Sequence, residues 1–360
     1  MTQNTAKGRL GWKEFLLSLF LIFAAWAGAE LFKGNDPASG GGQEGITVMF
    51  TTPRYPDAPS QHYGGLDDRL AEALDGAQES VDIAAYDFDL VGVAEALVAA
   101  QQRGVAVRLV TDADYEQELG PERLRRAGIP VVSDESAAFM HDKFVVIDGR
   151  QVWTGSWNLT DNGTYRNNNN VVIVDSTAVA ENYTAEFEEM FGDRQFGDRS
   201  PAETPHPQVD VAGMAVENAF SPEDDVQRKI LAVLETAQSD IRFMVFTLTD
   251  NEISKLLNRK LREGVSIQGV VESRNVGASG ADFEVLQQVG MDILQDGNPY
   301  MMHHKVLIVD EAIVITGSYN FTRNAAENND ENALIIYSPE IAAQYLEEFQ
   351  RVYRQAEEAQ

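Results

Sequence analysis

Two kinds of apolar pattern alternate along most of the chain. Segments in which apolar residues recur every three or four positions predict helices over residues 70–77, 93–103, 226–237 and 253–263. Each is followed by a short, largely apolar run that predicts a strand, over residues 80–88, 105–111, 240–248 and 265–271. Helices that alternate with apolar strands favour an α/β layered fold, in which the strands are buried between helices.

These elements form two copies of one unit. The second helix of each copy ends at a glycine, which favours a left-handed C-cap, and these glycines, Gly104 and Gly264, lie 160 residues apart. Later segments that begin at His141 and His303 match each other at an offset of 162. The duplication predicts two halves related by a pseudo-twofold axis. If the halves face one another, equivalent loops from both converge on a single shared site.

The boundaries of the copies follow from composition. Residues 197–210 are polar and contain three prolines, which is typical of a connector. We therefore predict a first repeat over residues 46–196 and a second repeat over residues 211–357. The Gly-rich stretch over residues 33–45 predicts a flexible linker that precedes the first repeat.

The N-terminal segment, residues 1–32, has the layout of an export signal. Lys7, Arg9 and Lys13 precede an apolar run over residues 15–29, and Ala27 and Ala29 provide a small-x-small cleavage site. The run is shorter than the roughly 20 residues of a typical bilayer-spanning helix, so a cleaved signal and a retained membrane anchor both fit. Either predicts an exported protein that is periplasmic, extracellular or anchored to the membrane.

Composition narrows the chemistry without changing the predicted fold. The 360 residues contain 28 Lys plus Arg against 57 Asp plus Glu, and the formal net charge of −29 repels a polyanionic duplex over most of the surface. Phosphate chemistry therefore requires a locally basic pocket. The absence of cysteine excludes a disulfide scaffold, a thiolate nucleophile and thiolate metal ligands.

Both copies carry the same polar residues at the same spacing. The pattern His-x-Lys-x4-Asp occurs as His141, Lys143 and Asp148 and again as His303, Lys305 and Asp310. The pattern Gly-Ser-x-Asn follows each Asp, at Gly155, Ser156 and Asn158 and at Gly317, Ser318 and Asn320. Residues two apart on a strand point to the same face, so we expect the His and Lys of each copy to project together into one cavity.

At these residues the chain resembles the phospholipase D superfamily, specifically the members that carry two HKD motifs in one chain. The resemblance covers roughly residues 46–353. It implies two tandem αβ repeats, each a mixed β-sheet flanked by helices, packed with pseudo-twofold symmetry around one shared active site. It also implies a phosphodiesterase that reacts through a covalent phosphohistidine, which is then attacked by water or another alcohol.

The residue types suit that reaction. Neutral imidazole is a competent nucleophile at phosphorus, and a second, protonated imidazole donates to the leaving oxygen, so His141 and His303 suffice without a metal ion or cofactor. Lys143 and Lys305 would offset the charge on the phosphoryl oxygens. The hydroxyl and amide groups of both Gly-Ser-x-Asn segments would add donors. The two motif Asp residues are predicted to anchor strand ends rather than to touch phosphate.

The copies differ at one position that bears on these roles. Glu331 lies 28 residues after His303, where family members commonly place a carboxylate against the imidazole, but the same offset from His141 leads to Asn169. A carboxylate raises the pKa of a histidine that it contacts, whereas an amide only orients the ring. With Glu331 assigned to His303, we predict that His141 is the nucleophile and His303 the acid. The missing carboxylate also raises the alternative of a catalytically weakened, phosphate-binding member.

Three further residues flank the motifs. His304 follows His303 directly and is expected on the opposite face of the strand, in packing or in solvent. Tyr86 and Phe246 fit either a substrate groove or the core.

The resemblance implies a reaction but leaves the substrate open, because the superfamily includes lipid hydrolases, transferases, synthases and nucleases. A nuclease benefits from a long basic groove, and basic residues gather here only in short stretches such as 123–126 and 259–262. We therefore predict hydrolysis of a phospholipid to phosphatidic acid and a head-group alcohol, beside a membrane surface. A nuclease of the same superfamily, with nucleic acid as substrate, is the alternative. No obligate protein partner is evident.

Overall fold

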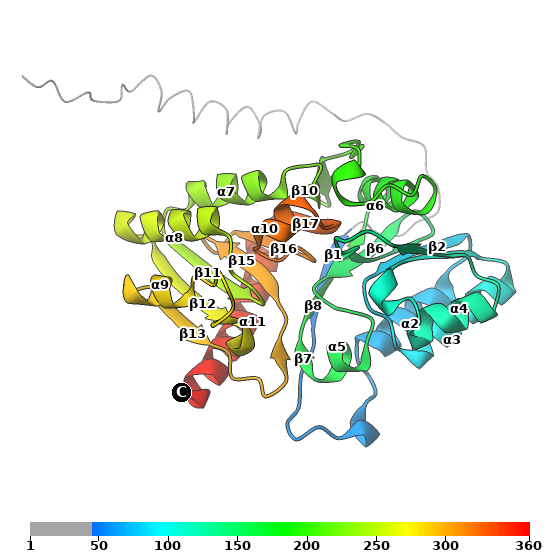
Figure 1. Ribbon diagram of the computed structural model, residues 1–360, viewed down its shortest axis with the longest axis horizontal. Coiled ribbons are helices and arrows are strands. Elements are labelled where there is room, and N and C mark those ends of the chain that lie inside the picture. Colours follow the sequence, from blue (N-terminus) through cyan, green and yellow to red (C-terminus); the bar gives the residue numbers. More distant parts are fainter. Residues whose placement is uncertain (1–44) are drawn as a thin grey trace, which may run out of the picture. The chain divides into compact units, whose positions relative to one another are not determined.

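Residues 45–360 fold into two αβ halves, each built on one large β-sheet, in a computed structural model of the chain (Figure 1). These are the residues that the structure describes. The predicted leader over residues 1–32 and nearly all of the predicted linker over residues 33–45 lie outside them. None of the helices between residues 45 and 360 has both the length and the apolar character that a bilayer-spanning helix requires.

The first sheet is mixed and has the spatial order β1-β8-β6-β5-β2-β3-β4. Its strands are β1 Gly45–Phe50, β2 Ser80–Ala85, β3 Ala106–Asp112, β4 Val131–Asp134, β5 Lys143–Ile147, β6 Gln151–Gly155 and β8 Asn170–Asp175. Strands β2, β3 and β4 pair in parallel, and the other neighbours pair antiparallel. Its helices are α2 Leu66–Gly76, α3 Val91–Arg103, α4 Leu119–Arg126, α5 Asp161–Tyr165 and α6 Thr177–Phe191.

The second sheet repeats this plan in the order β13-β12-β11-β15-β16-β17-β10-β9. Its strands are β9 Gln208–Val211, β10 Met214–Ser221, β11 Asp240–Val245, β12 Ser266–Val271, β13 Asp292–Gln295, β15 Lys305–Val309, β16 Ile313–Gly317 and β17 Glu331–Tyr337. Its helices are α7 Val226–Thr236, α8 Asn251–Glu263, α9 Phe283–Gln288, α10 Arg323–Glu327 and α11 Pro339–Ala359. Strand β9 overlaps the end of the segment that we predicted as a connector.

The predicted helix ends are confirmed at the two glycines. Helices α3 and α8 stop at Gly104 and Gly264, whose φ angles are 99° and 97°. A side chain is strained in this left-handed conformation, and glycine is not. Equivalent caps at equivalent positions give both repeats the same turn into their next strand.

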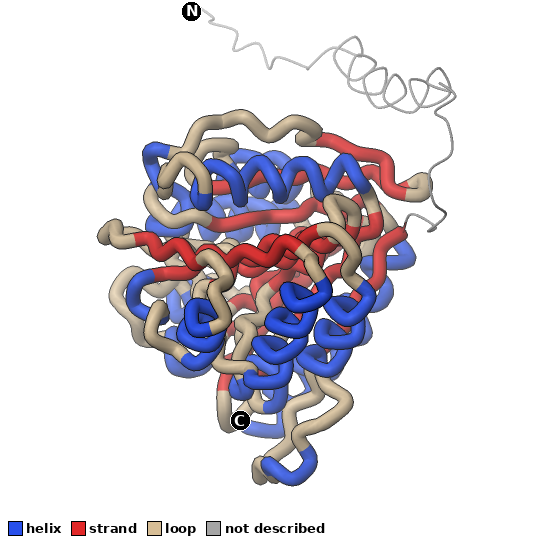
Figure 2. Tube along the Cα trace, turned by 90° about the vertical axis from the view of Figure 1, so that its right-hand side faces the viewer, coloured by secondary structure: helices blue, strands red, loops and turns tan. Residues whose placement is uncertain are grey.

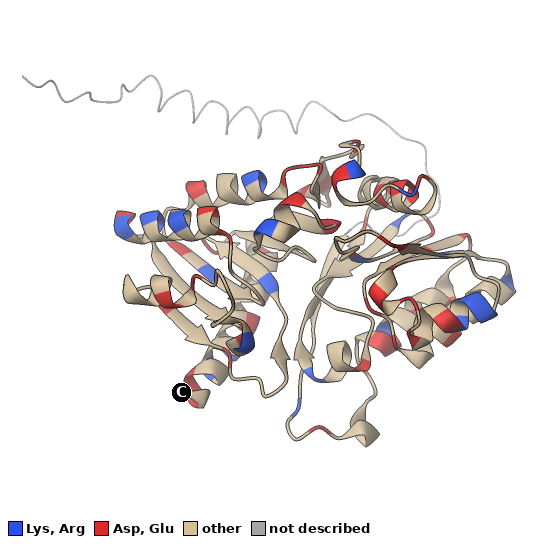
Figure 3. Cartoon of the chain, in the orientation of Figure 1, with Lys and Arg blue, Asp and Glu red and all other residues tan. Residues whose placement is uncertain are grey.

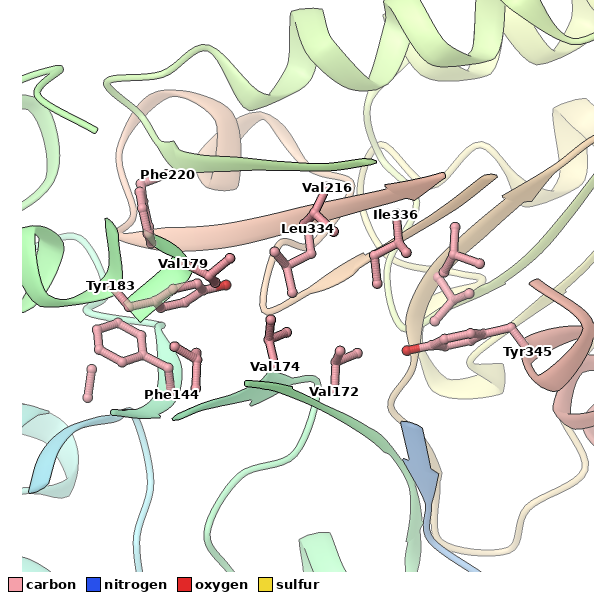
Figure 4. Close-up of a cluster of buried hydrophobic side chains, with 14 of the residues drawn as sticks. Phe144, Val172, Val174, Val179, Tyr183, Val216, Phe220, Leu334, Ile336 and Tyr345 are labelled. Carbon is pink, nitrogen blue, oxygen red and sulfur yellow. The ribbon is translucent and has the colours of Figure 1, made fainter. Parts of the chain in front are cut away.

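Alternating side chains along the strands build one core between the sheets and another outside each sheet. In β5, Phe144 and Val146 point into the shared inner core, whereas Val145 and Ile147 pack against the outer helices of the first repeat. Figure 4 shows the inner core, in which Val172 and Val174 of the first sheet face Leu334 and Ile336 of the second. In the view of Figure 2 most strands run through the middle, with helices above and below. The shared core holds the two repeats against each other.

Short backbone contacts also cross between the repeats near the motifs. Strand β7, Asn167–Asn168, pairs in parallel with β14, Met301–Met302. The His303 amide donates to Asn168 O at 2.9 Å, and the His141 amide donates to Asp330 O at 2.9 Å. The predicted fold class is therefore confirmed: two tandem mixed sheets with flanking helices are packed around one seam.

Candidate active site

Both motif histidines lie at this seam, directly before the first strand of their motif. His141 precedes β5 and His303 precedes β15. The two side chains line one cleft of about 700 Å³, together with Asn158 and Asn320. The structure thus brings residues 162 apart in the sequence into one cavity, as the duplication predicts.

Each histidine is held by a residue of the other repeat. His141 Nδ1 lies 2.7 Å from Glu331 Oε2. His303 Nδ1 lies 3.0 Å from Asn169 Oδ1 and 3.1 Å from Ser156 O. All three partners are acceptors, so each Nδ1 carries a proton and the lone pair of each neutral ring is on Nε2.

The predicted pairing of Glu331 with His303 is therefore wrong, and the partners are exchanged. The cause is the backbone pairing across the seam. The His141 amide is bonded to Asp330, so the next residue, Glu331, faces His141; the His303 amide is bonded to Asn168, so Asn169 faces His303. An offset within one repeat could not reveal this exchange.

The two lysines lie beside the histidines and are almost completely buried. Lys143 Nζ donates to His141 O at 2.8 Å, and Lys305 Nζ lies 3.2 Å from His303 Nε2. Each ammonium group also lies 5.0 Å from the centre of an aromatic ring, Tyr86 for Lys143 and Phe246 for Lys305. Each imidazole packs edge-on against the same ring. Tyr86 and Phe246 therefore belong to the site, and their separation of 160 residues, which equals the helix-cap offset, is the sequence signal for it.

Burial and crowded positive charge control the ionisation of this site. Burial, followed by the charges of Lys143 and Lys305, holds the pKa of His141 well below its usual range, and the same causes act on His303. Burial lowers the pKa of Lys143 to about 8 and raises the pKa of Glu331 to about 7. Both imidazoles are thus neutral near pH 7 before a phosphate enters.

The two serines position the histidine partners. Ser318 Oγ donates to Glu331 Oε2 at 2.9 Å, and Ser156 Oγ donates to Asn169 Oδ1 at 2.9 Å. Each hydroxyl also accepts a hydrogen bond from a backbone amide, so its proton and a lone pair are already engaged within the protein. The prediction that the serine hydroxyls donate to phosphate is therefore wrong for this arrangement, because neither serine lines the cleft and both hydroxyls donate to the residues behind the imidazoles.

The glycines of the same segments permit a close approach of two strands. Gly155 and Gly317 have φ angles of 144° and 148°. A Cβ atom at Gly155 would lie 2.3 Å from Asn170 O, and one at Gly317 would lie 2.2 Å from Asn332 O. No side chain fits at either position without movement of the neighbouring strand.

Asn158 and Asn320 are the polar groups of the motifs that remain available in the cleft. Both are half-buried, and within residues 45–360 the Oδ1 atom of each is buried without a hydrogen-bond partner. An Oδ1 atom only accepts hydrogen bonds, so the Nδ2 groups of these amides are the atoms suited to bind the oxygens of a ligand.

The motif Asp residues lie away from the cleft, in agreement with the anchoring role that we predicted. Asp148 accepts the backbone amides of Gln78, Glu79 and Ser80, and Asp310 does the same for the equivalent turn in the second repeat. Both adopt left-handed backbone conformations, with φ angles of 53° and 50°. They hold the end of the motif strand to the start of the neighbouring strand.

His304 does not line the cleft and is packed inside the protein, which is one of the two places that we predicted for it. It is fully buried, with Nδ1 3.2 Å from Asn170 Oδ1 and Nε2 2.9 Å from Glu348 Oε1. Asn170 comes from the first repeat, so this residue also links the two halves. Glu348 lies on α11, too far along the sequence for the motif to indicate it.

The rest of the cleft wall is mostly uncharged. It includes the aromatic and apolar side chains of Tyr86, Tyr115, Phe139, Phe246 and Met301, and several Asn and Thr residues. Its charged members apart from the histidines are Asp87, Asp89 and Arg323. Basic positions elsewhere are interspersed with acidic ones on the outer helices (Figure 3). Within residues 45–360, the one cluster with the spacing of metal ligands lies outside this cleft.

Comparison with known proteins assigns the chain to a family. A family model described as "Cardiolipin synthase, PLD-like domain" matches residues 70–191 and 230–353, one match in each repeat. A mitochondrial cardiolipin hydrolase of Xenopus laevis is 38% identical over 150 residues, which cover 41% of this chain and 70% of the relative. The human protein of the same name is 31% identical over 127 residues, covering 35% of this chain and 50% of the relative. A phospholipase D of Rickettsia typhi is 31% identical over 132 residues, covering 37% of this chain and 65% of the relative.

Solved structures show the same fold over a longer part of the chain. A phosphatidylserine synthase of Haemophilus influenzae superposes with a TM-score of 0.62 at 14% identity, covering 86% of each chain. A polyphosphate kinase of Porphyromonas gingivalis superposes with a TM-score of 0.60 at 16% identity, covering 85% of this chain and 50% of the other. At these identities the likeness establishes the fold alone. The duplicated family match, together with the paired histidines in one cleft, shows that the chain belongs to the phospholipase D superfamily, within its cardiolipin synthase, PLD-like family.

Proposed function

We propose that the protein is a metal-independent phosphodiesterase of the phospholipase D type, which hydrolyses a phospholipid to phosphatidic acid and a head-group alcohol. The observation that carries the proposal is the pair of histidines in one cleft. Each Nδ1 is bonded to a residue of the other repeat, so the lone pair of each neutral ring is on Nε2, and both rings line the same cleft. A nucleophile and an acid on either side of phosphorus are what a two-step displacement needs.

In the first step, His141 Nε2 attacks phosphorus and the bond from phosphorus to the head-group oxygen breaks. His303 Nε2 gives a proton to that oxygen. We assign attack to His141 because a phosphorylated imidazole is cationic, and Glu331 at 2.7 Å offsets this charge. Asn169 carries no charge, so the His303 imidazolium loses its proton readily. The role predicted for His141 is thus retained for a different reason.

Binding of the substrate provides the protonated His303 that the acid step requires. The pKa of His303 is lowered by burial and by the two lysines. A phosphodiester anion that binds between Lys143 and Lys305 offsets that positive charge and raises the pKa of His303 again. In the second step, His303 takes a proton from water, the water oxygen bonds to phosphorus, and the phosphorus–nitrogen bond breaks.

The cleft wall supports a lipid with one phosphate in the site. Its aromatic, amide and hydroxyl groups surround the histidines, and its one Arg, Arg323, is ion-paired with Glu327. A nucleic-acid backbone needs basic groups on both sides of the reacting phosphate. The relatives named cardiolipin hydrolase and phospholipase D support the same class. Export, as predicted from residues 1–32, would bring this cleft to a membrane surface.

A substrate panel tests the proposal. Purified protein would be incubated in EDTA with vesicles of cardiolipin, phosphatidylglycerol, phosphatidylethanolamine or phosphatidylcholine, and separately with single- and double-stranded DNA and RNA. We expect phosphatidic acid, or phosphatidyl products from cardiolipin, and intact nucleic acid. His141→Ala should be inactive, and His206→Ala, which removes a partly exposed imidazole outside the cleft, should keep full activity.

Cleavage of nucleic acid with no lipid product would overturn the lipid assignment and establish the nuclease alternative. Loss of turnover in EDTA at a temperature where the protein stays folded would overturn the metal-independent mechanism.

A further inference from the structure

Three glutamates outside the cleft form a compact group of oxygen atoms. Glu186 and Glu189 lie on α6, and Glu223 follows β10 in the second repeat. One carboxylate oxygen from each lies within 4.8 Å of the other two. The cluster therefore joins a helix of the first repeat to a loop of the second.

Glu186 and Glu189 are buried, and Glu223 is half-buried. Glu186 is 4% exposed and Glu189 is 9% exposed. Within residues 45–360, one oxygen of each of the three glutamates is buried and accepts no hydrogen bond. The charged groups that act most strongly on Glu186 are other carboxylates, those of Glu223, Asp142, Glu189 and Asp330. Buried carboxylates without a cation or a donor are costly, so the arrangement lacks a positive charge.

Asp142 is a second and separate indication of a missing ligand. It follows the motif His141 but does not line the cleft. It is fully buried, and its Oδ1 accepts from Asn332 Nδ2 at 2.6 Å. Its Oδ2 accepts no hydrogen bond from an amide, hydroxyl or basic group of the described residues, and its carboxyl group lies within hydrogen-bonding reach of that of Glu186. An unpaired carboxylate thus points into the cluster from behind the first HKD motif.

The second repeat shows what normally occupies these positions. The 162-residue offset places His304 at the position of Asp142, Glu348 at that of Glu186 and Arg351 at that of Glu189. Arg351 binds Glu348 through two nitrogens at 2.6 and 2.7 Å, and His304 Nε2 lies 2.9 Å from the same carboxylate. In the second repeat the carboxylate of Glu348 therefore has two residues as nitrogen-bearing partners, Arg351 and His304.

The first repeat keeps the central carboxylate and replaces both nitrogen partners with carboxyl groups. Glu223 adds a further carboxylate from the loop after β10. Equivalent backbone positions thus carry an ion-paired carboxylate in the second repeat and a group of carboxyl groups without a basic partner in the first. Because the two repeats pack in the same way, the difference points to a cation supplied from solution.

The ligand atoms indicate which cation fits. All are carboxylate oxygens, which suit hard cations such as Ca²⁺ and Mg²⁺ rather than Zn²⁺ or Cu²⁺. Two oxygens on opposite sides of Ca²⁺, at about 2.4 Å each, lie about 4.8 Å apart, whereas Mg²⁺ at about 2.1 Å holds them within about 4.2 Å. All separations between the three oxygens lie within the Ca²⁺ limit, and a set of several protein carboxylates suits Ca²⁺, whereas Mg²⁺ usually keeps several waters.

We propose that Glu186, Glu189 and Glu223 bind one Ca²⁺ ion, with Asp142 as the carboxylate behind them. The ion replaces the positive charge that Arg351 and His304 supply in the second repeat. It fastens α6 to the loop after β10 and holds the back of the first HKD motif. The site takes no part in the displacement at phosphorus, so it does not rest on the proposed reaction.

Calcium binding without substrate tests the site. Full-length protein would be stripped with EDTA, dialysed, and titrated with Ca²⁺, Mg²⁺ or Zn²⁺ in a calorimeter, with thermal unfolding measured in parallel. We expect one Ca²⁺ per chain, binding of Mg²⁺ at least about 10-fold weaker, and a Tm increase of about 5 °C at Ca²⁺ 100-fold above its Kd.

Three variants separate a metal site from a cluster held by protons. Glu186→Gln should abolish the Ca²⁺ response, and Glu189→Arg, which copies Arg351, should abolish it while raising the Tm of the stripped protein. Glu181→Gln, an exposed residue of the same helix, should respond like wild type. If stripped wild type shows no Ca²⁺ heat and no Tm shift at millimolar Ca²⁺, protons neutralise the cluster and the proposal is wrong. Because no step uses substrate, that failure is distinct from failure of the lipid assay.

Discussion

The two repeats share a backbone plan and differ in the charges behind their motifs. Both place His and Asn at one cleft with a buried Lys beside the His, anchor the motif Asp in the same kind of turn, and need glycine at the same close approach. Yet His141 is held by a carboxylate and His303 by an amide. The two repeats therefore share their backbone geometry, but a few side chains that differ between them place different charges next to equivalent atoms.

The same contrast extends behind the motifs. The second repeat neutralises Glu348 with Arg351, whereas the first repeat gathers carboxylates around Glu186. The difference teaches that a shared active site does not require equal halves. One half can be specialised for forming the covalent bond and the other for proton transfer, provided that the backbone pairing across the seam is kept.

The strongest way to break the comparison is to remove each motif histidine separately. His141→Ala should lower turnover by at least about 10⁴-fold and give no phosphoenzyme, because the nucleophile is gone. His303→Ala should lower turnover by about 10²–10⁴-fold, and a p-nitrophenyl leaving group should recover much of the bond-cleavage step. Mass spectrometry of acid-sensitive phosphopeptides would measure both outcomes. A phosphate located on His303 would reverse the roles.

Exchanging the histidine partners should have the next largest effect. Glu331→Gln should reduce kcat by about 10²–10³-fold, because an amide orients the His141 ring but leaves the phosphorylated imidazole without a counter-charge. Asn169→Asp should cost less and should move the alkaline limb of the pH–rate profile upward, since a carboxylate raises the pKa of the acid His303. Equal losses in both variants, with unchanged pH profiles, would contradict the assigned asymmetry.

Substitutions of Gly155 and Gly317 test the close approach of two strands that both repeats share. Gly155→Ala and Gly317→Ala should each lower the free energy of unfolding by about 2–4 kcal/mol, because both combine a positive φ with a backbone oxygen closer than 2.5 Å. Denaturant unfolding would measure the two losses. Gly213→Ala, at a positive φ in open space, should show only the smaller conformational cost. A large loss at one motif glycine alone would show that the two repeats do not share this close approach.

The smallest expected effect concerns pH and stability. The folded state raises the pKa of Glu331 from 4.5 to about 7, so between these values it keeps a proton that the unfolded chain has released. This contribution is full below pH 4.5 and is lost as pH rises through 7. Relative to wild type, Glu331→Gln should therefore gain about 1–3 kcal/mol between pH 4.5 and 7. Thermal unfolding across this range would show it, and a constant difference would contradict the raised pKa.

Much of the fold and the identity of the motif residues could be predicted because they depend on short-range sequence patterns. Apolar periodicity and the two cap glycines located helices and strands, and the repeated spacing placed His141 and His303 on equivalent strands. The partner of each histidine could not be predicted in this way. Asn169 and Glu331 lie at equal offsets from the motif of their own repeat, and only the crossing of Asp330 to His141 and of Asn168 to His303 shows which ring each one faces.

The sequence alone determined the duplicated architecture and identified the histidine, lysine and asparagine side chains of the candidate site. These depend on conformational preferences and residue types that act within one repeat. Tertiary structure decided the exchange of partners, the buried place of His304 and the gathering of Glu186, Glu189 and Glu223. Those features depend on contacts between the two repeats. Burial there sets the ionisation energy of each charged group, and the spacing of residues along the chain does not reveal which groups meet.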